Sequence, residues 1–197
     1  MRNFYDNPDE MRQMALSSKY ELINWGNYIG SDTVDHMIMT PELERKIKQF
    51  FPENYYQVTC SRFRKAIKGD TYMSYIHVDS EERSSGWHIL VYLTKDANVK
   101  DGLVFYDDKV GTNITSVQEY EYNMAVVVDY SYFHAPMNKT GFGDCVENSR
   151  LLHIIEVMDT RTTHYKEAML RSSVRKLFQE HPNSRDDDHE PLSHSKT

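Results

Sequence analysis

A succession of about eight short segments with β-strand character runs from Tyr55 to Met158, and it constrains the fold more than any other feature. The segments are rich in Val, Ile, Tyr and Phe, and turn-forming pairs such as Gly69-Asp70 and Asp101-Gly102 separate them. Short strands without long helices between them favour an antiparallel sandwich or barrel. We expect strands at residues 55–64, 71–79, 88–94, 103–106, 113–120, 124–129, 132–134 and 150–158.

Helices are expected on both sides of this β-rich region. Asn7 can cap a helix that begins at Pro8, and Thr40 precedes a second start at Pro41. Apolar residues at helical spacing follow each start, and a third helical pattern covers residues 164–181. The last segment, 181–197, is polar and charged and is expected to be disordered. The sequence therefore predicts a single domain over residues 1–180, with its β core at about 55–158, followed by this tail.

Composition limits the classes of function. The formal net charge is −7, which makes broad binding to a nucleic-acid backbone an unlikely function. No apolar run is long enough to cross a bilayer, and the first residues lack the apolar core of a signal peptide, so we expect a cytoplasmic protein without a membrane partner. The two cysteines, Cys60 and Cys145, have no metal-binding or redox spacing.

The tripeptide His77-Val78-Asp79 closes the segment predicted as a strand at 71–79. Residues i and i+2 of a strand point to the same face, so one imidazole and one carboxylate would project side by side. Such a pair could bind a metal ion. The alternative is a histidine at a strand end followed by an aspartate that begins a turn, and the tripeptide alone does not decide between them.

The motifs downstream of His77 are more specific as a set. The sequence has HVD at 77–79, ILVYLT at 89–94, DGLVF at 101–105, AVVVDYSYFH at 125–134 and SRLLHII at 149–155. This order resembles the Fe(II)/2-oxoglutarate-dependent oxygenase superfamily, in its prolyl-hydroxylase-like branch. The resemblance covers about half of the chain, from near Thr71 to Met158. It implies a mainly β fold with flanking helices and a double-stranded β-helix core, of the jelly-roll or cupin-like type.

The resemblance also implies a chemistry and its residues. His77, Asp79 and His134 would bind Fe(II) and form the catalytic centre, which leaves coordination positions open for 2-oxoglutarate and O2. Arg150 would anchor the distal carboxylate of 2-oxoglutarate, because an arginine fork binds a carboxylate in a bidentate manner and stays charged. The implied reaction couples decarboxylation of 2-oxoglutarate to succinate and CO2 with hydroxylation of a C–H bond. An inserted loop at 138–148 accounts for the long interval between His134 and Arg150.

Other residues of these segments have two interpretations each. Tyr75 shares the expected strand face of His77, so its hydroxyl could contact 2-oxoglutarate or the substrate, or it could be a packed tyrosine. Arg62 and Arg64 could bind an anionic substrate, or they could be exposed arginines on an edge strand. His88 begins an apolar strand and could line the pocket, but we interpret both His88 and His153 as structural residues, and expect His153 on the strand face opposite Arg150.

Two other functional classes are open to the same sequence. One is a double-stranded β-helix protein that binds or interacts without catalysis, since fold alone does not imply function. The other is a β-sandwich interaction module with incidental histidines. The first would not need the complete set of two histidines, aspartate and arginine, and the second would make the order of five motifs a coincidence. The expected primary substrate is a peptide, a protein or a small molecule, with a prolyl or other amino-acid residue favoured by the resemblance.

Overall fold

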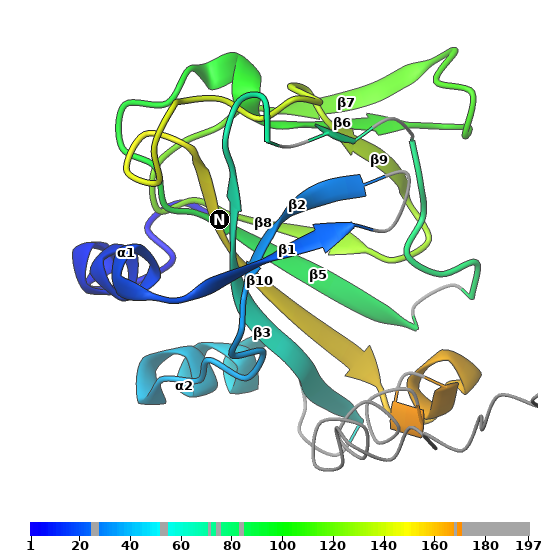
Figure 1. The fold of residues 1–197 in the computed structure, drawn as a ribbon. Helices are drawn as coiled ribbons and strands as arrows, with labels where there is room; N and C mark the ends of the chain where they lie inside the picture. The colour runs from blue at the N-terminus through cyan, green and yellow to red at the C-terminus, as the bar shows by residue number, and fades with distance from the viewer. Residues whose placement is uncertain are drawn as a thin grey trace, which may run out of the picture.

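The fold is described from a computed structural model, over residues 1–24, 28–51, 55–70, 72–73, 76–82, 85–167 and 169–170. Tyr75, the polar segment 181–197 and most of the helix expected at 164–181 lie outside these residues. Residues 163–167 form a helical turn, where that helix was expected to start. The described part is mainly β, with antiparallel sheets and two flanking α-helices (Figure 1).

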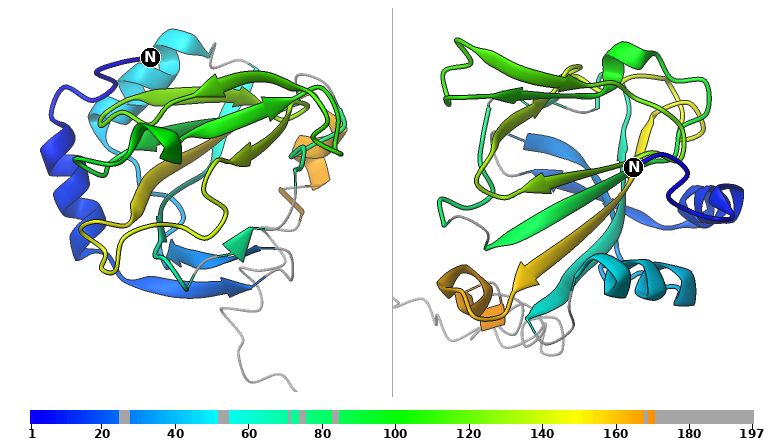
Figure 2. Two further views of the ribbon diagram at one scale, coloured as in Figure 1. Left: turned by 90° about the horizontal axis from the view of Figure 1, so that it is seen from above. Right: turned by 180° about the vertical axis from the view of Figure 1, so that it is seen from behind.

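The strands form two sheets. In the larger one the order is β1-β2-β3-β10-β5-β8, and β4 pairs with β2; in the smaller one it is β7-β6-β9. All strand pairs are antiparallel, and the two sheets lie across from each other (Figure 2). The strands are β1 (Tyr20–Asn24), β2 (Tyr28–Thr33), β3 (Tyr56–Ala66), β4 (Tyr72–Met73), β5 (Gly86–Tyr92), β6 (Leu103–Tyr106), β7 (Ile114–Gln118), β8 (Ala125–Asp129), β9 (Phe133–Pro136) and β10 (Arg150–Asp159).

The chain winds back and forth between the two sheets. From β3 in the larger sheet it passes through an isolated bridge at His77, which pairs with β9, and returns to β5. It then forms β6 and β7 in the smaller sheet, β8 in the larger, β9 in the smaller and β10 in the larger. This winding is that of a double-stranded β-helix, so the predicted fold class is confirmed. The strand predicted at 71–79 is wrong in its extent, because the described backbone has only β4 and the bridge at His77 there.

The helices α1 (Pro8–Ser17) and α2 (Pro41–Phe50) begin where the sequence predicts and cover one face of the larger sheet (Figure 1). The Thr40 hydroxyl oxygen accepts a hydrogen bond from the Leu43 amide at 3.1 Å, as expected of a cap. Asn7 does not cap α1; its side-chain amide instead donates to the Glu10 carboxylate at 3.0 Å. Among the described residues, no helix is long and apolar enough to cross a bilayer.

Strand β10 lies between β3 and β5 and separates two apolar clusters. Leu151, Ile155 and Val157 pack with the residues of the helices, whereas Leu152 and Ile154 belong to a second cluster between the two sheets. Since successive side chains of a strand point to opposite faces, a strand buried on both faces appears in the sequence as a nearly continuous apolar run. The inner face of β10 thereby lines the space between the two sheets.

The loop predicted at 138–148 is confirmed, because residues 137–149 contain no helix or strand. Gly141 has a φ of +69°, and a Cβ there would lie 2.5 Å from the Ala66 carbonyl oxygen. The neighbouring Phe142 amide donates to that same carbonyl at 3.2 Å. A glycine at this position thus lets the loop pack against the end of β3, just before β10 begins at Arg150.

His153 lies on the outer face of β10, buried in the cluster beneath the helices, as predicted. Its Nδ1 is 2.7 Å from the Tyr5 hydroxyl and its Nε2 is 2.8 Å from the Ser61 hydroxyl. Burial lowers the pKa of His153 to about 3. The neutral ring therefore satisfies both of its nitrogens inside the core, which is a structural role.

This burial predicts a pH dependence of stability. Between about pH 6.5, the ordinary pKa of histidine, and pH 3, the unfolded chain binds a proton at His153 that the native chain does not bind. Lowering the pH through this window should reduce the free energy of unfolding by up to about 1.4 kcal/mol per pH unit. Urea unfolding of the native chain and of His153→Gln between pH 7 and 5 should give a shallower slope for the variant. Equal slopes would show that His153 is not held neutral.

Candidate metal centre

The backbones of His77 and His134 pair with each other at the edge of the smaller sheet. The His134 amide donates to the His77 carbonyl at 2.9 Å, and the His77 amide donates to the His134 carbonyl at 3.2 Å. Residues directly opposite each other in an antiparallel pair project to the same face. The two imidazole rings accordingly lie with their centroids 4.5 Å apart.

Asp79 joins these histidines through a second backbone contact. The Tyr130 carbonyl accepts hydrogen bonds from the amides of Asp79 and Ser80, at 2.8 and 3.1 Å. One Asp79 oxygen, Oδ1, is 3.8 Å from His77 Nε2, and the other, Oδ2, is 3.7 Å from His134 Nε2. One ligand atom from each of the three residues lies within 4.8 Å of the others. The residues named from the sequence as metal ligands are therefore brought together, although Asp79 stands in a bend and not in a strand.

The tautomer of His134 suits a metal ligand. Its Nδ1 is 2.9 Å from the Tyr132 carbonyl oxygen, which can only accept, so Nδ1 carries the proton and Nε2 keeps its lone pair. Burial lowers the pKa of His134, although the Asp79 carboxylate opposes this shift. A neutral histidine with Nε2 directed toward Asp79 is the form that binds a divalent ion.

Asp79 is held as a carboxylate. Burial alone would raise its pKa, but His88, His134 and His77 together hold the pKa well below its usual range. His88 Nδ1 is 3.1 Å from Asp79 Oδ2, and His88 Nε2 is 3.6 Å from Glu156 Oε1. Burial opposes protonation of His88, yet the two carboxylates raise its pKa to about 9. His88 therefore lines the cavity, which was the alternative to a purely structural role, and its side chain contacts a candidate metal ligand.

The three candidate ligands line a cavity of about 390 Å³ between the sheets. Two histidines and one carboxylate are a donor set typical of a mononuclear iron site with open positions. Apolar and charged side chains share the walls of the cavity. The lining residues are Tyr28, Arg62, Arg64, His77, Asp79, His88, Leu90, Leu103, Tyr130, His134, Pro136, Arg150, Leu152, Ile154, Glu156, Met158 and His164.

Arg150 lines the same cavity from the first position of β10, on the face that carries Leu152 and Ile154 and opposite the face of His153. Its side chain is buried, and Nε makes a long contact of 3.4 Å with the Asp101 carbonyl. The nitrogen Nη2 is buried and makes no hydrogen bond with any described residue, and no carboxylate in the described ranges forms an ion pair with Arg150. A buried cation without a counter-ion is unfavourable, so this guanidinium is suited to an anionic ligand.

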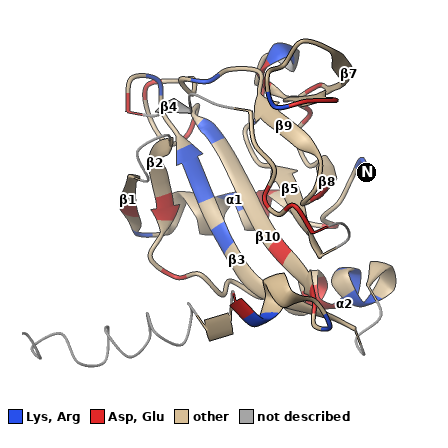
Figure 3. Cartoon of the chain, turned by 90° about the vertical axis from the view of Figure 1, so that its right-hand side faces the viewer, with Lys and Arg blue, Asp and Glu red and all other residues tan. Residues whose placement is uncertain are grey.

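Arg62 and Arg64 differ from Arg150 because both already have an acid partner. Asp32 on β2 accepts from Arg62 Nε at 2.8 Å and from Arg64 Nε at 2.6 Å. Arg62 also donates to Glu156 at 2.5 Å. Figure 3 shows the basic positions of β3 beside acidic positions of β2 and β10. The interpretation of these arginines as exposed edge residues is wrong, since β3 lies between β2 and β10 and both side chains are largely buried.

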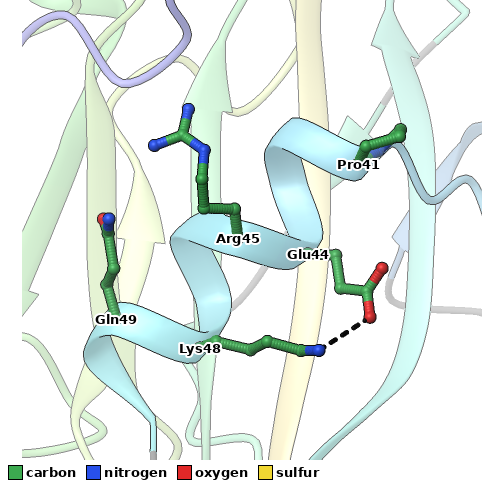
Figure 4. A pocket seen from close by; sticks show the side chains of 5 residues that line it. All are labelled: Pro41, Glu44, Arg45, Lys48 and Gln49. Atoms are coloured by element: carbon green, nitrogen blue, oxygen red, sulfur yellow. Dashed lines mark ion pairs between the residues drawn. The ribbon is translucent and has the colours of Figure 1, made fainter.

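A second depression lies on the outer face of α2 (Figure 4). Its walls are the exposed side chains of Pro41, Glu44, Arg45, Lys48 and Gln49. Glu44 and Lys48 form an ion pair at 3.0 Å, one helical turn apart. An exposed surface with an ordinary helical ion pair offers no converging set of chemical groups. The cavity between the sheets, where such groups converge, is therefore the candidate site.

Comparison with known proteins gives a distant structural likeness. The sequence matches no protein-family model, and no curated protein matches it significantly. Among solved structures, the crystal structure of a Pseudomonas putida prolyl-4-hydroxylase is similar to this chain. The superposition covers 81% of this chain and 89% of that chain, with 12% sequence identity and a TM-score of 0.49. A likeness at this distance does not by itself show a shared activity.

Proposed function

We propose that this protein is an Fe(II)- and 2-oxoglutarate-dependent dioxygenase. In this reaction one atom of O2 enters a substrate C–H bond to give an alcohol, and the other enters succinate, while 2-oxoglutarate loses CO2. The observation that carries the proposal is that two features occur together in one cavity. Two histidines and an ionised carboxylate converge at one place in its wall, and a buried arginine without an acid partner among the described residues stands in the same space.

The chain's own residues would have distinct roles. His77, Asp79 and His134 would hold the ion and leave part of its coordination sphere open. Bound there, Fe(II) supplies the redox chemistry that activates O2. Arg150 would receive the distal carboxylate of 2-oxoglutarate in a charge-assisted pair, which also gives its buried charge a partner. The apolar side chains of Leu103, Leu152 and Ile154, which also line the cavity, would help to exclude water from it.

The substrate class belongs to the same proposal. The sequence resemblance favours a prolyl or other peptidyl residue, or a free amino acid. We expect substrate choice to be determined by segment 1–53, which precedes β3, and by segments 80–86 and 138–148, which lie before β5 and β10. Tyr75 lies outside the described residues, so its predicted contact with 2-oxoglutarate or substrate stays a prediction.

The metal ligands can be tested without the primary substrate, through the slow uncoupled conversion of 2-oxoglutarate to succinate. Asp79→Ala should abolish Fe(II)-dependent formation of succinate, because it removes the only carboxylate of the set. Its circular dichroism spectrum should be unchanged, since this carboxylate is not part of either apolar cluster. Asp6→Ala, which removes an exposed carboxylate near α2, should retain the native rate and serves as the control. Native turnover in Asp79→Ala would exclude the proposed ligand set.

The anchor for 2-oxoglutarate has its own test. Arg150→Ala should raise the 2-oxoglutarate concentration required for half-maximal succinate formation by roughly 10- to 150-fold, since a hydrogen bond to a charged group contributes about 1.5–3 kcal/mol. Arg161→Ala is a matched control, because Arg161 is exposed and pairs with Asp159 outside the cavity. If the requirement of Arg150→Ala matched that of the control, another cation would have to bind the cosubstrate.

A further inference from the structure

A row of alternating charges crosses the inner face of the larger sheet and ends at the candidate metal ligand Asp79. Asp32 on β2 pairs with Arg62 on β3 at 2.8 Å, and Arg62 pairs with Glu156 on β10 at 2.5 Å. Glu156 is 3.6 Å from His88 on β5, which in turn is 3.1 Å from Asp79. The four strands are consecutive in the sheet order β2-β3-β10-β5. The row therefore connects four strands of the larger sheet to one of the candidate metal ligands.

Backbone register fixes the middle of this row. Glu156 and His88 are directly opposite each other in the antiparallel pair of β10 and β5. Arg62 is opposite Ile154, one diagonal step from Glu156 on the same face. All of these side chains are largely buried, so solvent screens their attraction weakly. The His88 ring thus lies between two carboxylates, with Nε2 facing Glu156 and Nδ1 facing Asp79 at ion-pair distances.

We propose that His88 is a positioning residue for Asp79, whose Oδ2 it holds through Nδ1 so that Asp79 offers only Oδ1 to the metal ion. Two histidines and a carboxylate bound through one oxygen occupy three coordination positions, whereas binding through both oxygens would occupy a fourth. In this arrangement His88 keeps open the positions that 2-oxoglutarate and O2 need. Glu156 acts at the next step through its ion pair with Nε2 of the same ring, and Arg62 in turn holds Glu156. The inference rests on the metal site of the proposed function.

The two contacts of His88 can be separated by two substitutions of similar kind. The side-chain amide nitrogen of asparagine corresponds in position to Nδ1 of histidine, so His88→Asn can still donate to Asp79 but loses the contact with Glu156. The amide nitrogen of glutamine corresponds to Nε2, so His88→Gln keeps the contact with Glu156 and loses the one with Asp79. Both variants remove the ring, so a role of the ring in packing alone would affect them equally.

The experiment measures binding of Mn(II), which needs neither substrate nor turnover, from the loss of the electron paramagnetic resonance signal of the free ion. His88→Gln should weaken binding by roughly 10- to 100-fold, the usual effect of removing a partner that orients a metal ligand. His88→Asn should stay within about threefold of the native chain. His36→Gln, which changes a half-exposed histidine outside the cavity, is the control and should bind as the native chain does.

A further variant tests the same inference in case the His88 variants do not fold. Glu156→Gln keeps the shape of the side chain and weakens its hold on Nε2, so Mn(II) binding should weaken in the same direction by a smaller factor. If the native chain binds Mn(II) and the asparagine and glutamine variants bind equally, the positioning role is wrong while the metal site stands. If the native chain does not bind Mn(II), the proposed function fails and this inference fails with it.

Discussion

Two backbone hydrogen bonds between His77 and His134 determine where the candidate metal centre lies. They add His77 to the edge of the smaller sheet and bring its imidazole beside that of His134, a residue far away in the sequence. Asp79 follows His77 by two residues. Its amide donates to the carbonyl of Tyr130, a residue in the turn that precedes β9. The ligand set is therefore a product of how the double-stranded β-helix closes, and no local segment could form it alone.

Charge balance inside the cavity supports the proposal that an anion binds there beside a cation. Arg62 and Arg64 are neutralised by Asp32, and Arg62 is shared with Glu156. Arg150 lacks such a partner among the described residues, although its side chain is equally buried. Because an uncompensated buried charge costs several kcal/mol, a dianion that reaches from Arg150 to a divalent ion near Asp79 would complement both ends.

Much of this arrangement could be predicted from the sequence, but the tertiary pairings could not. The period of two in strand β10 placed Arg150 on the inner face and His153 in the core, because such alternation is set locally. The sequence left two interpretations of His88 open, a structural residue or one that lines the pocket, since only the sheet order brings His88 beside Asp79. The acid partner of the arginines, Asp32, was missed because β2 is a short strand with little apolar alternation, and its charge acquires meaning only next to β3.

The most direct test of the account is an anaerobic titration of the metal-free native chain with Fe(II) and 2-oxoglutarate, followed by visible absorption. We expect a weak charge-transfer band that develops only when both are present, because 2-oxoglutarate would bind the ion held by His77, Asp79 and His134. The band should be absent from His134→Ala. If the native chain gave no band, or bound the two independently, the cavity would not be an oxygenase site, and the chain would be a binding module on this fold.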